Sequence, residues 1–183
     1  PINAGLPNMV VRFYPNEKTA ILGFELGEVQ ALLGVPAGSN LEGKLIKVKE
    51  YSDYSKIVAI FYNSMDSLVG NRSFRQALSY QTPAIEGEEE AKGPIDPFSW
   101  AFNKEAKDYG FNNEAASEAL ERAKSAKPDV LERELILTTT PQLENTGKKV
   151  VASWRELGIN AVLRIESGLP QNFQALMITQ SIP

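Results

Sequence analysis

The 183-residue sequence contains neither cysteine nor histidine. Without these residues the chain has no thiolate nucleophile, no Cys/His zinc site and no imidazole that acts as a general base. A conventional serine–histidine–aspartate triad is therefore excluded, and catalysis would have to rest on carboxylates, lysine, serine or tyrosine. The absence of cysteine is compatible with an oxidising or a reducing compartment.

An excess of positive charge and a long apolar run are also missing. The 19 Lys and Arg residues against 23 Asp and Glu residues give a formal net charge of −4. Nucleic-acid binding requires a basic surface, so no nucleic-acid partner is expected. No apolar run approaches the roughly 20 residues of a spanning helix. The sequence opens without a leader pattern and stops after an apolar, strand-like run, so we expect a piece of a longer protein.

Hydrophobic periodicity predicts strands and helices that alternate along the chain. Short apolar or β-branched runs bounded by Pro or Gly predict strands, and apolar residues spaced three and four apart predict helices. The predicted strands are residues 9–14, 29–35, 45–49, 57–62, 134–140, 159–165 and 173–178. The predicted helices are residues 17–27, 72–80, 113–123 and 145–157. The pattern indicates an α/β fold, in which the continuously apolar strand 57–62 is expected to be central and covered on both faces.

One stretch differs in character from the rest. Residues 86–99 are acidic and rich in Pro and Gly, which is typical of a boundary between structural parts. We therefore divide the chain into residues 1–85, the connector 86–99, and residues 100–183. The glutamates of the connector form a charge run, which more often marks a solvated segment than a metal or catalytic site.

Three side chains are candidates for binding, each with a structural alternative. Asn63 follows the predicted central strand, and open α/β sheets bind ligands at the carboxyl ends of their strands; alternatively Asn63 is a turn residue. Trp100, with Phe98, is either a stacking platform for a ligand or an aromatic anchor that pins its loop to the core. Arg75 is either a charge anchor for a ligand or a partner in a surface ion pair, and we favour the ion pair.

Several segments, taken in order, resemble the extracellular solute-binding proteins of family 5, the oligopeptide- and dipeptide-binding proteins of ABC importers. The segments that carry the resemblance are 11–17, 26–32, 61–63 (Phe-Tyr-Asn), 73–80 (with Arg-Gln-Ala-Leu), 93–100 (Gly-Pro-Ile-Asp-Pro-Phe-Ser-Trp), 109–116 and 157–160 (Leu-Gly-Ile-Asn). Three places depart from the pattern of the family. Gln30 stands where Asp is usual, residues 82–92 lack the usual connector, and residues 166–175 are shorter than is typical.

The resemblance implies a periplasmic-binding-protein-like α/β fold with a partial two-lobe architecture. Residues 1–85 would be the second segment of the first lobe, and residues 100–183 would start the other lobe. It further implies non-catalytic capture of a solute, most simply a peptide, by lobe closure, with an ABC permease as partner. Such proteins are periplasmic or extracellular and associated with the cell envelope, often as lipoproteins.

The resemblance also places the ligand-binding residues. They would be Phe61, Tyr62, Asn63, Pro97 and Trp100, with no catalytic residue, no metal ligand and no cofactor. The alternatives are an α/β protein-interaction module that uses the acidic connector as a docking strip, and a hydrolase-like enzyme without histidine. A Gly-x-Ser-x-Gly nucleophile elbow, which would support the enzyme, is missing from the sequence.

Overall fold

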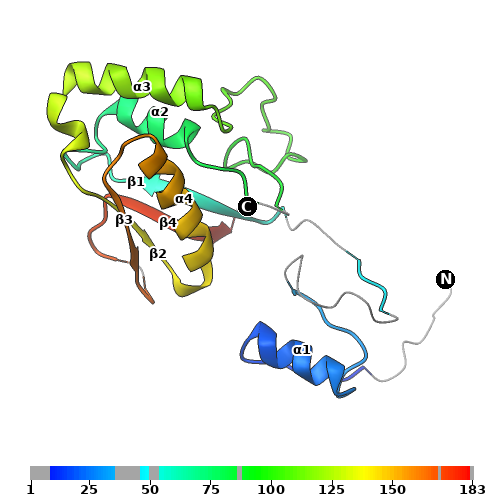
Figure 1. Ribbon diagram of the computed structural model, residues 1–183. Coiled ribbons are helices and arrows are strands. Elements are labelled where there is room, and N and C mark those ends of the chain that lie inside the picture. Colours follow the sequence, from blue (N-terminus) through cyan, green and yellow to red (C-terminus); the bar gives the residue numbers. More distant parts are fainter. Residues whose placement is uncertain (1–8, 36–45, 50–53, 86–87, 169, 182–183) are drawn as a thin grey trace. The chain divides into compact units, whose positions relative to one another are not determined.

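The computed structural model describes residues 9–35, 46–49, 54–85, 88–168 and 170–181. The chain forms two compact units, Pro1–Tyr51 and Ser52–Pro183. We call them the amino-terminal unit and the carboxy-terminal unit, and each is described by itself (Figure 1).

The amino-terminal unit contains the helix α1 (Glu17–Glu25). Its first turn is capped by Asn16, whose side-chain oxygen accepts a hydrogen bond from the backbone N–H of Thr19 at 3.0 Å. After the helix, Gly27 adopts a φ of 77°, a left-handed conformation that favours glycine. The helix predicted over 17–27 is therefore confirmed.

The strands predicted in the same unit are not formed. Residues 9–14, 29–35 and 46–49 are irregular, and residue 45 lies outside the described residues. A β-branched, apolar segment becomes a strand only when another strand pairs with it. These segments have no ladder partner among the described residues, so the three strand predictions are wrong.

The carboxy-terminal unit is built on a four-stranded mixed sheet in the order β1-β4-β2-β3. The strands are β1 (Lys56–Tyr62), β2 (Leu135–Thr139), β3 (Ala161–Ile165) and β4 (Ala175–Ser181). β2 runs parallel to both β3 and β4, whereas β1 runs antiparallel to β4. The four strand predictions in this unit are confirmed, but β1 is an edge strand of the described sheet and not the predicted central strand.

Three helices pack with this sheet: α2 (Arg72–Tyr80), α3 (Asn113–Ala126) and α4 (Glu144–Glu156). Short 3₁₀ turns at Pro128–Leu131 and Pro141–Leu143 precede β2 and α4 respectively. Asn71 and Asn112 cap α2 and α3 by accepting hydrogen bonds of 3.1 and 2.9 Å from backbone N–H groups. In Figure 1, α3 lies outermost, with α2 beside it and α4 crossing the strands. The helix predictions for this unit are confirmed to within three residues at each end.

One hydrophobic core joins elements from both sides of the connector 86–99. Its buried cluster includes Phe74 and Leu78 of α2, Leu120 of α3, Leu137 of β2, Trp154 of α4 and Met177 of β4. The indole N–H of Trp154 donates to the Leu78 carbonyl oxygen at 3.0 Å. The boundary between the compact units therefore lies near residue 51, and the connector runs within one unit. How these units correspond to the lobes of a longer protein stays a prediction.

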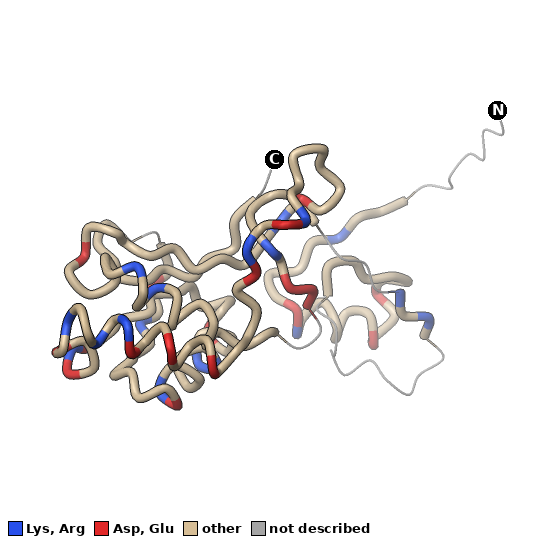
Figure 2. The backbone as a smooth tube through the Cα atoms, turned by 90° about the horizontal axis from the view of Figure 1, so that it is seen from above, with Lys and Arg blue, Asp and Glu red and all other residues tan. Residues whose placement is uncertain are grey.

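Acidic and basic residues are interspersed over the helices of the carboxy-terminal unit (Figure 2). On α3, for example, Glu118 and Arg122 form an ion pair of 3.7 Å one turn apart. Exposed pairs of this kind contribute little to stability, but they keep the helix surface solvated.

Candidate functional site

An apolar groove lies beside β1. Its walls come from three segments that are distant in sequence, and its volume is about 530 Å³. We call it the β1 groove; it is lined by Ile57, Val58, Ala59 and Phe61 of β1, by Ala91, Gly93 and Pro94 of the connector, and by Gln180 and Ser181 of β4. Its size falls within the roughly 300–1,000 Å³ of small-molecule sites, and its apolar lining with a few polar groups is typical of them.

The β1 groove runs along most of the length of β1, from Ile57 to Phe61. Because β1 is antiparallel to β4, Ile57 near the start of β1 pairs with Gln180 near the end of β4. Phe61, which also lines the groove, pairs with Leu176 near the start of β4, so the groove extends along β1 from the carboxyl end of β4 back toward its start. Open α/β sheets bind ligands in the crevice outside the carboxyl ends of parallel strands. This position makes the β1 groove the candidate functional site.

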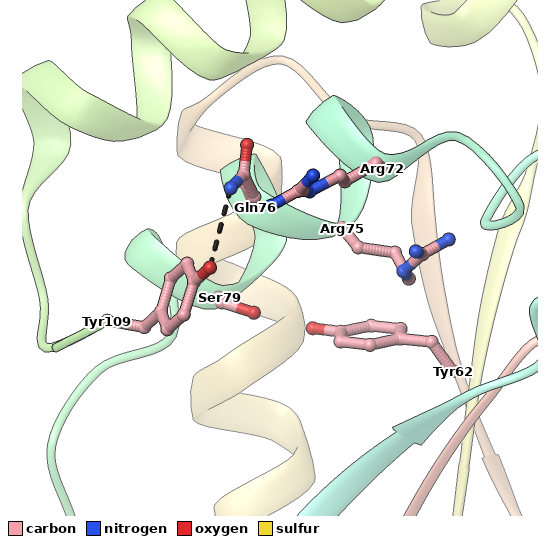
Figure 3. Close-up of a pocket in the computed structure, with 6 residues that line it drawn as sticks. All are labelled: Tyr62, Arg72, Arg75, Gln76, Ser79 and Tyr109. Carbon is pink, nitrogen blue, oxygen red and sulfur yellow. Dashed lines mark hydrogen bonds between the residues drawn. The ribbon is translucent and has the colours of Figure 1, made fainter. Parts of the chain in front are cut away.

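Phe61 and Tyr62 do not share a site, although the sequence analysis groups them. Successive side chains of a strand point to opposite faces of the sheet. Phe61 lines the β1 groove, with 42% of its surface exposed. Tyr62 lies on the other face and directs its hydroxyl group toward Ser79 of α2 (Figure 3). Of the two, only Phe61 is placed to contact a ligand in the groove.

Asn63 lies at the opposite end of β1 from most of the groove. The residue before it, Tyr62, pairs with Ala175 at the start of β4, so the predicted place at the carboxyl edge of the parallel strands is wrong. The reason is that β1 runs against the other strands. The side-chain amide of Asn63 donates to the Phe173 carbonyl at 3.1 Å, and its oxygen accepts from the Met65 N–H at 3.1 Å. These contacts are those of a turn residue, and a role of Asn63 in ligand binding stays a prediction.

Pro97 and Trp100 lie on the outside of the same unit. The Trp100 side chain is 97% exposed, so the interpretation of Trp100 as a core anchor is wrong. Neighbouring Phe98 contacts only the edge of the Tyr54 ring, at 5.2 Å between centroids. Neither Pro97 nor Trp100 is among the residues that line the β1 groove. From the predicted loop, Gly93 and Pro94 take that place, and the stacking role of Trp100 stays a prediction.

A second hollow, of about 220 Å³, lies beside α2 (Figure 3). We call it the α2 pocket; it is lined by Tyr62, Arg72, Arg75, Gln76, Ser79 and Tyr109. Arg75 uses Nη1 to donate to the carbonyl oxygens of Val69 and Gly70, both at 2.8 Å. The surface ion pair favoured for Arg75 is therefore wrong, since the hydrogen-bond partners of this side chain are backbone carbonyls.

The environment of Tyr62 keeps its phenol protonated. Burial raises the pKa of the Tyr62 hydroxyl well above its ordinary value, because the anion would lose its hydration. The hydrogen bond with Ser79 and the positive charge of Arg75 act in the opposite direction but are smaller. At neutral pH Tyr62 is therefore a neutral hydrogen-bonding group in the wall of the α2 pocket.

The described part of the chain holds neither a cluster of metal-binding side chains nor a membrane-spanning helix. Within those residues, no three His, Cys, Asp or Glu side chains gather in a way that could hold a metal ion. No helix that the structure describes is both long and apolar enough to cross a membrane.

Comparison of the sequence with known families shows to which family the chain belongs. Residues 3–177 match the family described as "Bacterial extracellular solute-binding proteins, family 5 Middle". The chain belongs to this family. The resemblance seen in the sequence is thereby confirmed. No curated protein matches the chain.

Solved structures show the same fold at low sequence identity. A putative peptide binding protein AppA from Clostridium difficile is 18% identical, with a TM-score of 0.68 over 93% of this chain and 39% of that one. DppA from Helicobacter pylori, solved in complex with the peptide STSA, is 16% identical, with a TM-score of 0.64 over 93% of this chain and 36% of that one.

NikA from Brucella suis, solved in complex with Fe(III)-EDTA, is also 16% identical to the chain. Its TM-score is 0.74 over 91% of this chain and 40% of that one. At such identities the comparisons show the fold, which is the predicted periplasmic-binding-protein-like α/β fold. The chain spans about two-fifths of the length of these proteins or less.

Proposed function

We propose that the protein to which this chain belongs captures a peptide for import by an ABC transporter, without catalysing a reaction. Membership of the family supports solute capture for import. The observation that carries the proposal further is the β1 groove, an apolar hollow along β1 that reaches the carboxyl end of β4 at Gln180 and Ser181. Two of the similar structures are described as peptide-binding or peptide-bound, which favours this class of ligand.

The backbone of β1 offers a way to hold an extended ligand. β1 is an edge strand of the described sheet, so one row of its N–H and C=O groups faces away from β4. A peptide that lies along this row would form main-chain hydrogen bonds as an added strand does, and its alternate side chains would enter pockets on one face. Backbone recognition of this kind is independent of ligand sequence.

The lining of the groove indicates which side chain it would accept. No charged side chain is among the described residues that line the groove, and its walls at Val58 and Phe61 are 40% and 42% exposed. An apolar or small side chain would bury surface there, whereas a charged one would lose hydration without a partner. The same lining disfavours an anionic metal chelate, the class of solute bound in the NikA structure.

Capture would proceed by closure of two lobes. The two lobes would belong to the full-length protein, since this chain spans about two-fifths or less of the length of the similar structures. Hinge motion would close the lobes over the ligand, and an ABC permease at the cell envelope would recognise the closed form. The site of action would then be periplasmic or extracellular.

Native mass spectrometry of the full-length parent protein, purified from cells without refolding, tests the proposal. We expect a series of adducts at short-peptide masses that disappears on denaturation. The variant Phe61→Asp should lose these adducts, because it places a charge in the apolar groove. Phe98→Asp is the matched control, since Phe98 is 79% exposed and outside the groove.

Two results would contradict the proposal. One is a ligand-free mass that persists after incubation with mixed peptides. The other is a single adduct of defined, non-peptide mass, which would identify a dedicated receptor for another solute.

A further inference from the structure

The wall of the α2 pocket is held in place by contacts between side chains. One wall is Tyr109, which follows the connector and is held by three contacts. Gln76 donates to the Tyr109 hydroxyl at 3.4 Å, and the Tyr80 ring lies 5.1 Å from the Tyr109 ring. The ammonium group of Lys107 lies 5.1 Å from the centre of the Tyr109 ring. Figure 3 shows Tyr109 across the pocket from Tyr62, with Ser79 between them.

The charged side chains among the described residues that line this pocket are all positive. Arg72 and Arg75 both contribute guanidinium groups, and no carboxylate is among the described residues that line the pocket. Neither arginine forms an ion pair with a carboxylate of the described residues. Two uncompensated guanidinium groups beside one small hollow create a positive potential that attracts an anion.

Arg75 is held in place before any ligand arrives. Its Nη1 is fixed by the carbonyl oxygens of Val69 and Gly70. A guanidinium carries further N–H donors on Nε and Nη2, and these remain for a ligand. Because the side chain is already ordered, binding costs little additional conformational entropy.

The other lining groups are neutral and suited to an oxyanion. The Gln76 amide keeps a second N–H besides the one donated to Tyr109. Because Ser79 and Tyr62 hydrogen-bond to each other, one of their two hydroxyl groups remains to donate. The raised pKa of Tyr62 keeps this phenol protonated, so it does not compete as an anion for the arginines. The pocket therefore presents several donors around a positive charge.

We propose that the α2 pocket binds a small oxyanion, a carboxylate or a phosphate. At about 220 Å³ the pocket is smaller than the roughly 300 Å³ at which drug-sized sites begin, which fits a small ligand. Tyr62 lines the pocket, whereas its neighbour Phe61 lines the groove, and successive side chains of a strand point to opposite faces of the sheet. The oxyanion site is thus separate from the groove and does not rest on the function proposed for it.

Isothermal titration calorimetry of the full-length protein tests this site. Sodium phosphate and sodium acetate serve as probes, each compared with sodium chloride at the same ionic strength. We expect saturable binding of at least one probe, and which one binds identifies the source of the oxyanion. Arg72→Gln should weaken the binding about tenfold, as expected for the loss of a charge-assisted hydrogen bond.

Matched variants test whether anion binding depends on the side chains of the α2 pocket or only on the net charge of the protein. Arg122→Gln removes an exposed arginine of α3 that pairs with Glu118, so it should leave the binding unchanged. Arg75→Lys keeps the charge but loses the planar fork, so it should weaken binding severalfold. The inference is overturned if neither probe binds beyond the chloride control, or if Arg72→Gln and Arg122→Gln have equal effects. Peptide adducts in native mass spectra of Arg72→Gln should persist, because the groove is unchanged.

Discussion

Replacing Trp154 with alanine tests whether α2 and α4 share one core across the connector 86–99. Trp154 is completely buried, and its indole N–H donates to the Leu78 carbonyl oxygen at 3.0 Å. A Trp side chain buries roughly 150–250 Å², which at about 25 cal/mol per Å² corresponds to about 4–6 kcal/mol. The carbonyl of Leu78 keeps a second donor, the Thr82 hydroxyl at 2.8 Å, so the substitution leaves no unpaired acceptor there.

We therefore expect Trp154→Ala to lower the free energy of unfolding of this chain by about 4 kcal/mol, within the range of such truncations. Trp154→Phe should cost about 2 kcal/mol, because it keeps most of the apolar surface but loses the hydrogen bond. The assay is urea unfolding followed by circular dichroism. Trp100→Ala is the control: this side chain is 97% exposed, and its loss should change stability by less than about 0.5 kcal/mol. A cost below about 1 kcal/mol for Trp154→Ala would refute the shared core.

Two further predictions concern backbone conformation and pH. Gly158 follows α4 with a φ of 85°, so Gly158→Ala should lower the free energy of unfolding in urea by about 1 kcal/mol. Gly93→Ala is the control: there is open space around the new methyl group, so this free energy should change little. Because burial raises the pKa of Tyr62, its contribution to stability is fully present below the unfolded pKa of about 10 and is lost as pH rises above it. Tyr62→Phe should reduce the loss of stability that the parent chain shows between about pH 9 and 11, and an unchanged pH profile would contradict this assignment.

Local patterns in the sequence predict the elements of the carboxy-terminal unit well. The helix 72–80 has a capping Asn and a buried face of Phe74, Ala77 and Leu78, and the structure reproduces its bounds. These features depend on neighbours within a few residues, so a single sequence contains the necessary information.

Pairing between distant segments was beyond the reach of local patterns. The apolar run 57–62 was correctly predicted as a strand, but its direction against β4 depends on residues more than a hundred positions away. That direction moves the carboxyl end of β1, with Asn63, away from the ligand-binding edge. It also brings Gln180 and Ser181 to the groove, and no local signal marks these two residues as part of a site.

Alternation along a strand could have separated two of the predicted site residues. Phe61 and Tyr62 are adjacent in β1, so they necessarily face opposite sides of the sheet. The sequence analysis grouped them because the resemblance to the family covers them as one motif. The exposure of Trp100 was harder to predict from the sequence. Trp is mostly buried in folded proteins, and the loop that contains Trp100 has no periodic pattern.

Hydrogen–deuterium exchange of the full-length protein, with and without a bound peptide, tests the central claim most directly. The account predicts slower exchange of backbone amides at residues 57–61 of β1 and at residues 91–94, because a ligand in the β1 groove would cover the first and contact the second. Exchange in α2 should change much less. Protection confined to other parts of the protein, with residues 57–61 and 91–94 unchanged by peptide, would contradict the assignment of the groove as the binding site.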